Sequence, residues 1–204
     1  MLGSPLSESA VRALLVYVEE LCAWNQRINL TAIRDPEDIV TYHFLDSLSA
    51  LSAFEPEPHS TLADLGTGAG FPGAVLQIAR PELRVTLIEA GKKKAAFLHH
   101  LRGRLHLSRL AIVEDRIEAV RASFDRLISR AISPSRVLAM APPLLKIGGE
   151  LILFSKRPGG LPLPERDSSW SIRRTVSVTL PFTQESRSII VLVPRPPIAR
   201  NAKT

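Results

Sequence analysis

Apolar residues near the N-terminus recur at intervals of three and four, which is the period of an α-helix. The recurring positions are Val11, Leu14, Leu15, Val18, Leu21 and Cys22. This spacing predicts an amphipathic helix over residues 8–26. A second helix is predicted over residues 36–52, because Asp35 can cap its first turn and Pro36 suits its first position.

From residue 61 the pattern changes to short apolar runs that alternate with helical segments. The expected strands cover 61–66, 84–90, 110–115, 124–131 and 149–156, and the expected helices cover 70–79, 92–106 and 134–146. This alternation is typical of a parallel sheet with helices on both faces. Two late strands, 171–180 and 187–194, follow a loop at 157–169 and should pair antiparallel at one sheet edge.

The same reading divides the chain into parts. Residues 1–54 are expected to form a helical extension, 55–60 a linker, 61–194 an α/β domain of Rossmann-like fold, and 195–204 a disordered tail. At 204 residues with 45% hydrophobic content, the chain is long enough for a sizeable core. No internal repeat is visible.

A glycine-rich turn follows the first predicted strand of the sheet. Gly66, Gly68 and Gly70 occupy every second position after Asp64, and they allow the backbone to turn tightly and approach a ligand. A dinucleotide-binding turn would have a further glycine where Phe71 stands. The acid followed by G-x-G-x-G is the form that holds S-adenosylmethionine, although purely structural glycines remain an alternative.

An acidic residue ends the second predicted strand of the sheet. Glu89 lies 23 residues after Gly66, where a ribose-binding carboxylate falls in strand-helix-strand cofactor folds. A carboxylate that accepts both ribose hydroxyls makes charge-assisted hydrogen bonds. The alternative is a solvated glutamate at a strand end.

The cysteine content and the N-terminus bear on compartment. A single cysteine, Cys22, excludes a disulfide framework and a cysteine-based metal site, and it indicates a reducing compartment. The first 30 residues lack a signal-peptide pattern, and no apolar run is long enough to cross a membrane. We expect a soluble cytoplasmic protein without a bound metal.

Charge is unevenly distributed along the chain. Residues 1–54 carry three basic and seven acidic side chains, whereas residues 92–136 carry eleven basic and four acidic ones. The basic residues of the second segment include Lys92, Lys93, Lys94 and Arg102. A field of this kind attracts phosphates and favours a nucleic-acid substrate, with an ordinary solvated face as the alternative.

Several of these motifs, in this order and spacing, resemble the bacterial small-subunit ribosomal RNA guanine-N7 methyltransferases, also called glucose-inhibited division protein B. The similar segments are Asn29-Leu-Thr31, Arg34-Asp35, His43-Phe-Leu-Asp46-Ser47, Asp64 to Gly73, Gly91 to Leu98, Ser129-Arg130-Ala131 and, more weakly, Glu185 to Ile190. The resemblance implies a class I methyltransferase fold, S-adenosylmethionine as cofactor, and methylation of a guanine N7 near the decoding centre.

The resemblance also implies which residues form the site. The expected cofactor-binding residues are Gly66, Phe71, Ile117, Glu118 and Arg130, joined by Asp64, Gly68, Gly70 and Glu89. The expected RNA-binding residues are Lys92, Lys93, Lys94, Arg102, Arg34 and His43. Two of these have structural alternatives, because Arg130 could be a strand-end ion-pair partner and His43 could form a packed pair with Asp46.

The chemistry of guanine N7 supports the prediction of N7 methylation, and it requires no catalytic residue of the protein to be assigned. N7 has a free lone pair at neutral pH, so no protein base is needed. The cysteine of pyrimidine-C5 enzymes and the Asn-Pro-Pro-aromatic motif of adenine-N6 enzymes are missing after the fourth strand. The expected partner is small-subunit ribosomal RNA or a ribosomal particle, met by a monomer. The other classes are a different RNA or DNA methyltransferase, an inactive ribosome-associated protein, and an NAD-dependent dehydrogenase.

Overall fold

The computed structural model describes residues 5–156 and 169–195. The predicted disordered tail therefore lies outside the described residues except for its first residue, and so does almost all of the predicted loop at 157–169. In the part of the chain that is described, no helix is long and apolar enough to span a membrane.

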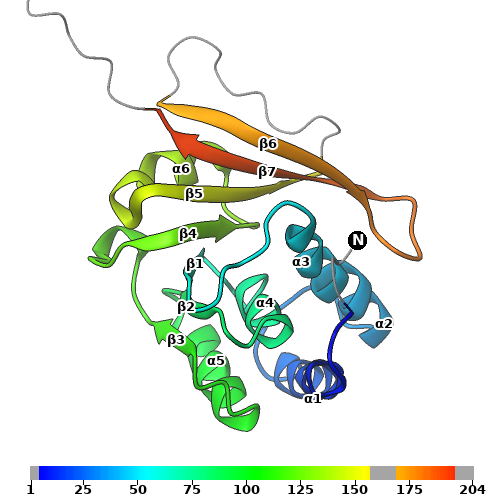
Figure 1. The fold of residues 1–204 in the computed structure, drawn as a ribbon. Helices are drawn as coiled ribbons and strands as arrows, with labels where there is room; N and C mark the ends of the chain where they lie inside the picture. The colour runs from blue at the N-terminus through cyan, green and yellow to red at the C-terminus, as the bar shows by residue number, and fades with distance from the viewer. Residues whose placement is uncertain (1–4, 157–168, 196–204) are drawn as a thin grey trace, which may run out of the picture.

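A seven-stranded sheet with the order β3-β2-β1-β4-β5-β7-β6 forms the centre of the molecule (Figure 1). Its strands are β1 (Thr61–Leu65), β2 (Arg84–Ile88), β3 (Leu110–Val113), β4 (Phe124–Ser129), β5 (Leu145–Ser155), β6 (Trp170–Thr179) and β7 (Ser186–Pro194). Strands β1 to β5 are parallel, while β7 pairs antiparallel with both β5 and β6. The predicted Rossmann-like sheet with a closing antiparallel edge hairpin is confirmed.

Neighbouring residues of the strands point to opposite faces, and each face has its own apolar cluster. Leu62 and Ile128 belong to the larger cluster, whereas Ala63 and Leu127 belong to the smaller one. The larger cluster includes the N-terminal helices together with α4 (Gly73–Ala79) and α5 (Lys92–Arg104), and the smaller one includes α6 (Pro134–Met140). The helical extension therefore shares one core with the sheet.

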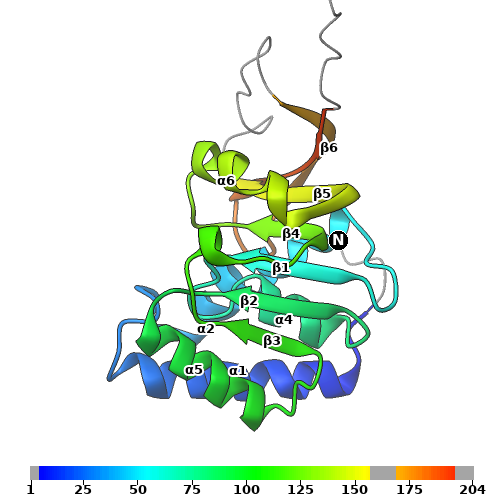
Figure 2. The same ribbon diagram turned by 90° about the vertical axis from the view of Figure 1, so that its left-hand side faces the viewer.

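The first helix, α1 (Glu8–Asn25), agrees with the predicted range and is capped by Ser7. It packs beside α4 and α5, and Figures 1 and 2 show it next to α5. Tyr17 is fully buried, donates a hydrogen bond to the Ala69 carbonyl, and stacks on Phe71 at 5.4 Å between ring centroids. The helix thereby supports the glycine-rich turn from beneath.

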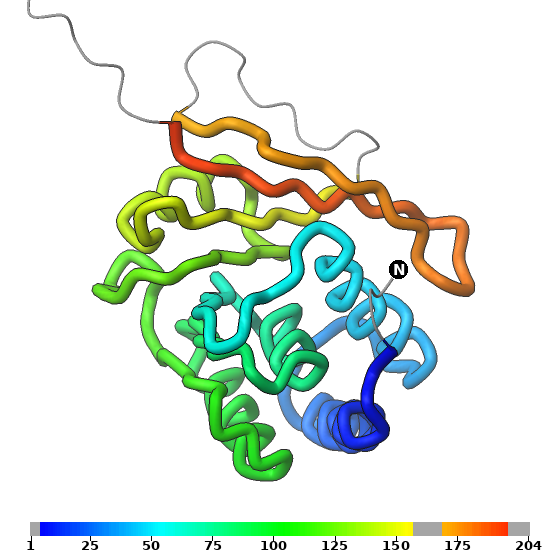
Figure 3. The backbone as a smooth tube through the Cα atoms, in the orientation of Figure 1, coloured from blue at the N-terminus to red at the C-terminus, as the bar shows by residue number. Residues whose placement is uncertain are grey.

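The second helical stretch covers residues 36–52 as predicted, but its hydrogen bonding is irregular. It runs from α2 (Pro36–Ile39) through a π-helical segment (Val40–Leu45) and α3 (Asp46–Leu48) to a 3₁₀ turn (Ser49–Ser52). Asp35 caps it by accepting from the Glu37 and Asp38 N–H groups. Figure 3 shows this stretch beside the β6–β7 hairpin, which it contacts through the final turn.

Three predicted boundaries were wrong by three or more residues. The helix expected at 134–146 ends at Met140 and is followed by one 3₁₀ turn (Pro142–Leu144), and β5, expected from residue 149, begins at Leu145. The prolines at 142 and 143 lack N–H donors and cannot continue the helix. The helix expected from residue 70 begins at Gly73, because the residues before it form the glycine-rich turn.

A buried ion network joins the second helical stretch to the sheet. Asp46 accepts a hydrogen bond from Arg130 Nη1 through Oδ2 and another from Arg187 Nε through Oδ1, both at 3.0 Å. The side chains of Asp46 and Arg187 are 7% and 6% exposed. One carboxylate thus ties α3 to the end of β4 and to the start of β7.

Replacing Asp46 by Asn should destabilise the fold by about 3–5 kcal/mol, because two arginines would be left without their shared counter-charge in a buried site. Urea unfolding followed by circular dichroism measures this difference. Asp38→Asn is the matched control, since Asp38 is an exposed aspartate of the same stretch, and it should change stability by no more than about 0.5 kcal/mol. Equal losses in the two variants would contradict a structural role for the network.

Candidate functional site

The turn between β1 and α4 has the conformation that its glycines allow. Gly66, Gly68 and Gly70 have φ angles of +69°, +64° and +102°, a backbone conformation that residues with side chains rarely adopt. A Cβ built on Gly68 would meet no heavy atom within 4 Å. The backbone at Gly68 therefore borders open space in which a ligand can lie against it.

Asp64 is buried at the base of this turn. Its Oδ2 accepts hydrogen bonds from Thr67 Oγ1 at 2.6 Å and from the Gly73 N–H at 2.8 Å. Burial raises the pKa of Asp64 to about 6, although these hydrogen bonds oppose the shift. Asp64 thus holds the turn closed onto α4, and its Oδ1 is a buried acceptor with no partner among the described residues.

Glu89, directly after β2, connects the glycine turn to the start of α5. Its Oε2 accepts from the Gly68 N–H at 2.9 Å, and its Oε1 accepts from the Gly91 N–H at 2.8 Å. A carboxylate has about four acceptor positions, so Glu89 can also bind hydroxyl groups of a ligand. Glu89 therefore lies against the glycine turn, and its contact with a ribose stays a prediction.

The ring of His43 lies between Arg130 and the glycine turn. It stacks on Phe71 at 4.5 Å, its Nδ1 lies 3.1 Å from Arg130 Nη2, and its Nε2 lies 2.7 Å from Thr31 Oγ1. Burial, followed by the positive charge of Arg130, lowers the pKa of His43 to about 4. His43 is therefore neutral at pH 7. Its ring contacts Phe71, Arg130 and Thr31, whereas the Asp46 carboxylate, expected as its packed partner, pairs with Arg130 and Arg187 instead.

Ile117 and Glu118 lie in a 3₁₀ turn (Ile117–Ala119) that follows β3. Ile117 is buried against the smaller apolar cluster, whereas Glu118 is exposed with Oε1 3.5 Å from Arg136. Apart from Asp64, which lies within β1, the expected cofactor-binding residues thus follow the carboxyl ends of β1 to β4, where ligands bind in open α/β sheets. No cluster of three potential metal ligands occurs among the residues described.

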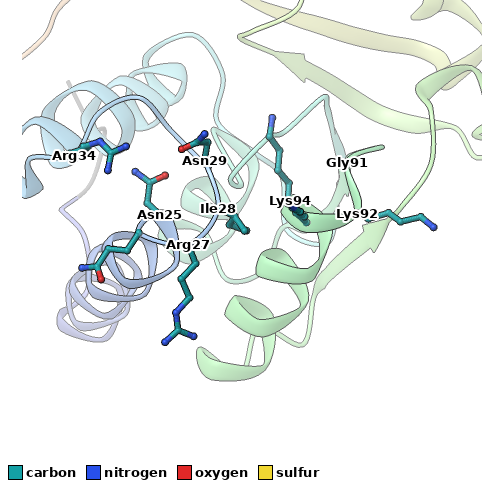
Figure 4. A pocket seen from close by; sticks show the side chains of 10 residues that line it. Asn25, Arg27, Ile28, Asn29, Arg34, Gly91, Lys92 and Lys94 are labelled. Atoms are coloured by element: carbon teal, nitrogen blue, oxygen red, sulfur yellow. The ribbon is translucent and has the colours of Figure 1, made fainter.

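A pocket of about 530 Å³ lies between the end of α1 and the start of α5. We call it the basic pocket; its lining residues are Asn25, Gln26, Arg27, Ile28, Asn29, Arg34, Gly91, Lys92, Lys93 and Lys94. Five of the ten carry positive charge, and none of the ten is acidic. Figure 4 shows Lys94 extending between α5 and the loop after α1, whereas Lys92 points away from that loop.

Four of the six predicted RNA-binding residues line the basic pocket. Arg34 joins the three lysines, while Arg102 lies in the last turn of α5 and lines other pockets. His43 is also absent from its lining. Arg27 was missed by the sequence reading because it follows a helix end and belongs to no charge run.

A second pocket, of about 330 Å³, lies where β4 and β5 end. We call it the Asp46 pocket; its lining residues are Ile33, Tyr42, His43, Asp46, Arg130, Ala131, Phe154, Ser155, Lys156, Glu185 and Arg187. Arg130 brings it next to the glycine turn, since its guanidinium carbon lies 5.5 Å from the Phe71 ring centroid. The sequence reading missed Glu185 and Arg187 as site residues, because they come from the distant hairpin.

Comparison with known proteins gives consistent relatives. Curated proteins named ribosomal RNA small subunit methyltransferase G are 47% identical in Methylobacillus flagellatus over 134 residues, and 35% identical in Polynucleobacter asymbioticus over 202 residues. The first alignment covers 65% of this chain and 64% of that relative; the second covers 95% and 91%. The chain thus spans slightly less than two thirds of the Methylobacillus flagellatus relative. The same holds for a relative from Chloroflexus aggregans, of which the alignment covers 66%.

Solved structures with the same fold are distant in sequence. TrmN from Thermus thermophilus has 17% identity and a TM-score of 0.58, with 72% of this chain and 48% of that chain covered. A mutant of MtNAS in complex with S-adenosylmethionine has 14% identity and a TM-score of 0.60, with 92% and 76% covered. These likenesses confirm the class I methyltransferase fold. The model of the family described as rRNA small subunit methyltransferase G (GidB) matches residues 10–190, and the chain belongs to this family.

Proposed function

We propose that the chain transfers a methyl group from S-adenosylmethionine to N7 of a guanine in a loop of small-subunit (16S) ribosomal RNA near the decoding centre. The proposal rests on the hydrogen bond from the Gly68 N–H to Glu89, which places an acidic side chain against the glycine turn, and on the basic pocket beside them. Family membership supplies the substrate class.

The residues present fit the cofactor. The open backbone at Gly68 offers a surface for the donor, and Glu89 retains acceptor positions for ribose hydroxyls. Ile117 and Glu118, after β3, are proposed to border the adenine, and Arg130 the amino-acid end. When bound, S-adenosylmethionine supplies a methyl group on a positively charged sulfur.

The protein contributes positioning rather than proton transfer. Guanine N7 attacks with its own lone pair, so no side chain has to remove a proton. His43 is neutral and held by Thr31 and Arg130, and burial raises the pKa of Tyr17 well above its ordinary value. The proposed contribution of the site is alignment of the two reactants and exclusion of water.

The basic pocket is proposed to hold the phosphate backbone of the RNA. Its five positive side chains can neutralise several phosphates, and Asn25 and Asn29 add amide groups. Arg104 is engaged differently, because it pairs with Glu20 on α1. The positive field of α5 is therefore concentrated at its N-terminal end.

We further propose that the chain acts as a monomer in the cytoplasm, where ribosomes are assembled.

Glu89→Ala should weaken S-adenosylmethionine binding by roughly 1.5–3 kcal/mol, because charge-assisted hydrogen bonds to the ribose are lost. Titration calorimetry measures the change. Glu19→Ala, an exposed acid on the outer face of α1, is the control and should bind normally. Unaltered affinity in Glu89→Ala, or binding of NAD in place of S-adenosylmethionine by the original protein, would contradict the proposal.

Changing Lys92, Lys93 and Lys94 together to Glu should weaken binding to small-subunit RNA and flatten its salt dependence, while S-adenosylmethionine affinity stays nearly the same. Each lost phosphate contact lowers the slope of log K against log salt by about 0.7–0.9. Filter binding at several salt concentrations measures both effects. Arg12→Glu, a charge reversal on the exposed face of α1, is the control. An unchanged slope would place the RNA elsewhere.

Methyl transfer in a single turnover should be nearly independent of pH from about 6.5 to 8.5. The pKa of His43 is about 4 and that of Asp64 about 6, so both groups keep one charge state over most of this range. Rapid-quench assays measure the rate, and mass spectrometry of digested RNA identifies 7-methylguanine. A steep rise with pH would reveal a protein base, and methyl groups on an exocyclic nitrogen, carbon or ribose would refute the assignment.

A further inference from the structure

The Asp46 pocket contains a row of ion-paired side chains, and the proposed contacts with the cofactor and the RNA backbone give most of them no role. Arg130, Asp46, Arg187 and Glu185 follow one another at distances of 3.0, 3.0 and 2.8 Å. The two central side chains, Asp46 and Arg187, are buried, whereas Glu185 is 47% exposed. The row therefore ends in a carboxylate that a ligand can reach.

Strand pairing fixes where this carboxylate lies. Ser155 at the end of β5 pairs with Ser188 of β7, so Glu185 lies three residues before that pair and past the carboxyl end of β5. Glu185 is held there by the backbone bond from the Leu180 N–H to its carbonyl and by Arg187 Nη2 on its Oε2. No other donor to its carboxylate occurs among the described residues, which leaves Oε1 available.

The opposite end of the pocket lies next to the glycine turn, where the methyl donor is proposed to bind. Arg130 follows β4, the neighbour of β1 in the sheet, and its guanidinium lies over the ring of Phe71 in the glycine turn. A base in this pocket would thus have the donor on one side and Glu185 on the other. Its lining residues include the aromatic residues Tyr42 and Phe154.

Guanine is the base whose chemistry matches these two ends. It presents two adjacent donors, N1–H and N2–H, on one edge, and N7 on the opposite edge. Each carboxylate oxygen has two acceptor positions, so Glu185 can accept from both donors while Oε2 keeps its bond from Arg187. Adenine presents an acceptor at N1 and would be repelled. Binding of guanine through N1–H and N2–H therefore turns N7 toward the donor.

We propose that the Asp46 pocket receives the unstacked target guanine and that Glu185 selects it by accepting hydrogen bonds from N1–H and N2–H. Arg187 and Asp46 are positioning residues, because Arg187 pairs with Glu185 and is itself held by the buried carboxylate of Asp46. This inference rests on the proposed guanine methylation and adds the residue that recognises the base.

The test compares Glu185→Ala and Glu185→Gln with the original protein on small-subunit RNA. Each variant should lower kcat/KM for methyl transfer on the order of 10- to 100-fold, because Glu185→Ala loses both hydrogen bonds to the base and Glu185→Gln keeps at most one. S-adenosylmethionine affinity and thermal stability should stay unchanged. The matched control is Gln184→Ala, an exposed neighbour in the same hairpin turn that lines neither pocket, and it should react normally.

A second substrate separates base recognition from support of the hairpin. Small-subunit RNA is assembled by ligation with inosine, which lacks the N2 amino group, at the position found to be methylated. The original protein should lose on the order of 10-fold in kcat/KM on inosine, whereas Glu185→Ala should show no further loss. Glu185→Gln provides the same comparison if the alanine variant folds poorly.

Two results would overturn the inference. One is full activity of both Glu185 variants, and the other is an equal inosine penalty in the original protein and in the variants. A third result would instead contradict the proposed function. If the original protein does not methylate guanine in small-subunit RNA at all, the proposed function is wrong, and so is the inference that rests on it.

Discussion

The carboxylate of Asp46 is the constraint on which the site depends most. It lies on a helical stretch outside the sheet, yet it pairs with Arg130 after β4 and with Arg187 on β7. Because these groups are buried, the charges are stable only together, and any shift of one element would leave a charge unpaired. The network therefore fixes the helical extension, the parallel sheet and the closing hairpin in one arrangement around the pocket.

The cofactor side of the site depends on backbone geometry more than on side-chain charge. Positive φ angles at Gly66, Gly68 and Gly70 shape the turn, Asp64 ties it to α4, and Glu89 ties it to α5. Beneath it, α1 contributes the buried ring of Tyr17. A turn held from three directions is already shaped before a ligand binds, so little ordering remains to oppose binding.

Local signals in the sequence predicted most of the fold. Short apolar runs located the strands of the sheet, the Asp35-Pro36 pair located a helix start, and the glycine run located the tight turn between β1 and α4. The helix end before the tandem prolines of residues 142 and 143 was predicted wrongly, because the apolar pattern continues past the point where the prolines stop the helix. Pairings between distant segments could not be predicted, since Asp46 and Arg187 are 141 residues apart and no local pattern encodes their contact. For the same reason the separation of Arg102 from Lys94 and the inclusion of Glu185 in a pocket became visible only in the structure.

We propose that one guanine of small-subunit RNA lies between the glycine turn and the β6–β7 hairpin. Cryo-electron microscopy of the protein bound to small ribosomal subunits with S-adenosylhomocysteine would show this arrangement. We expect the cofactor product against Gly68 and Glu89, RNA phosphates in the basic pocket, and an unstacked guanine in the Asp46 pocket with N7 toward the sulfur. Cofactor product bound away from the glycine turn, or RNA seated on another face with no base in the Asp46 pocket, would contradict it.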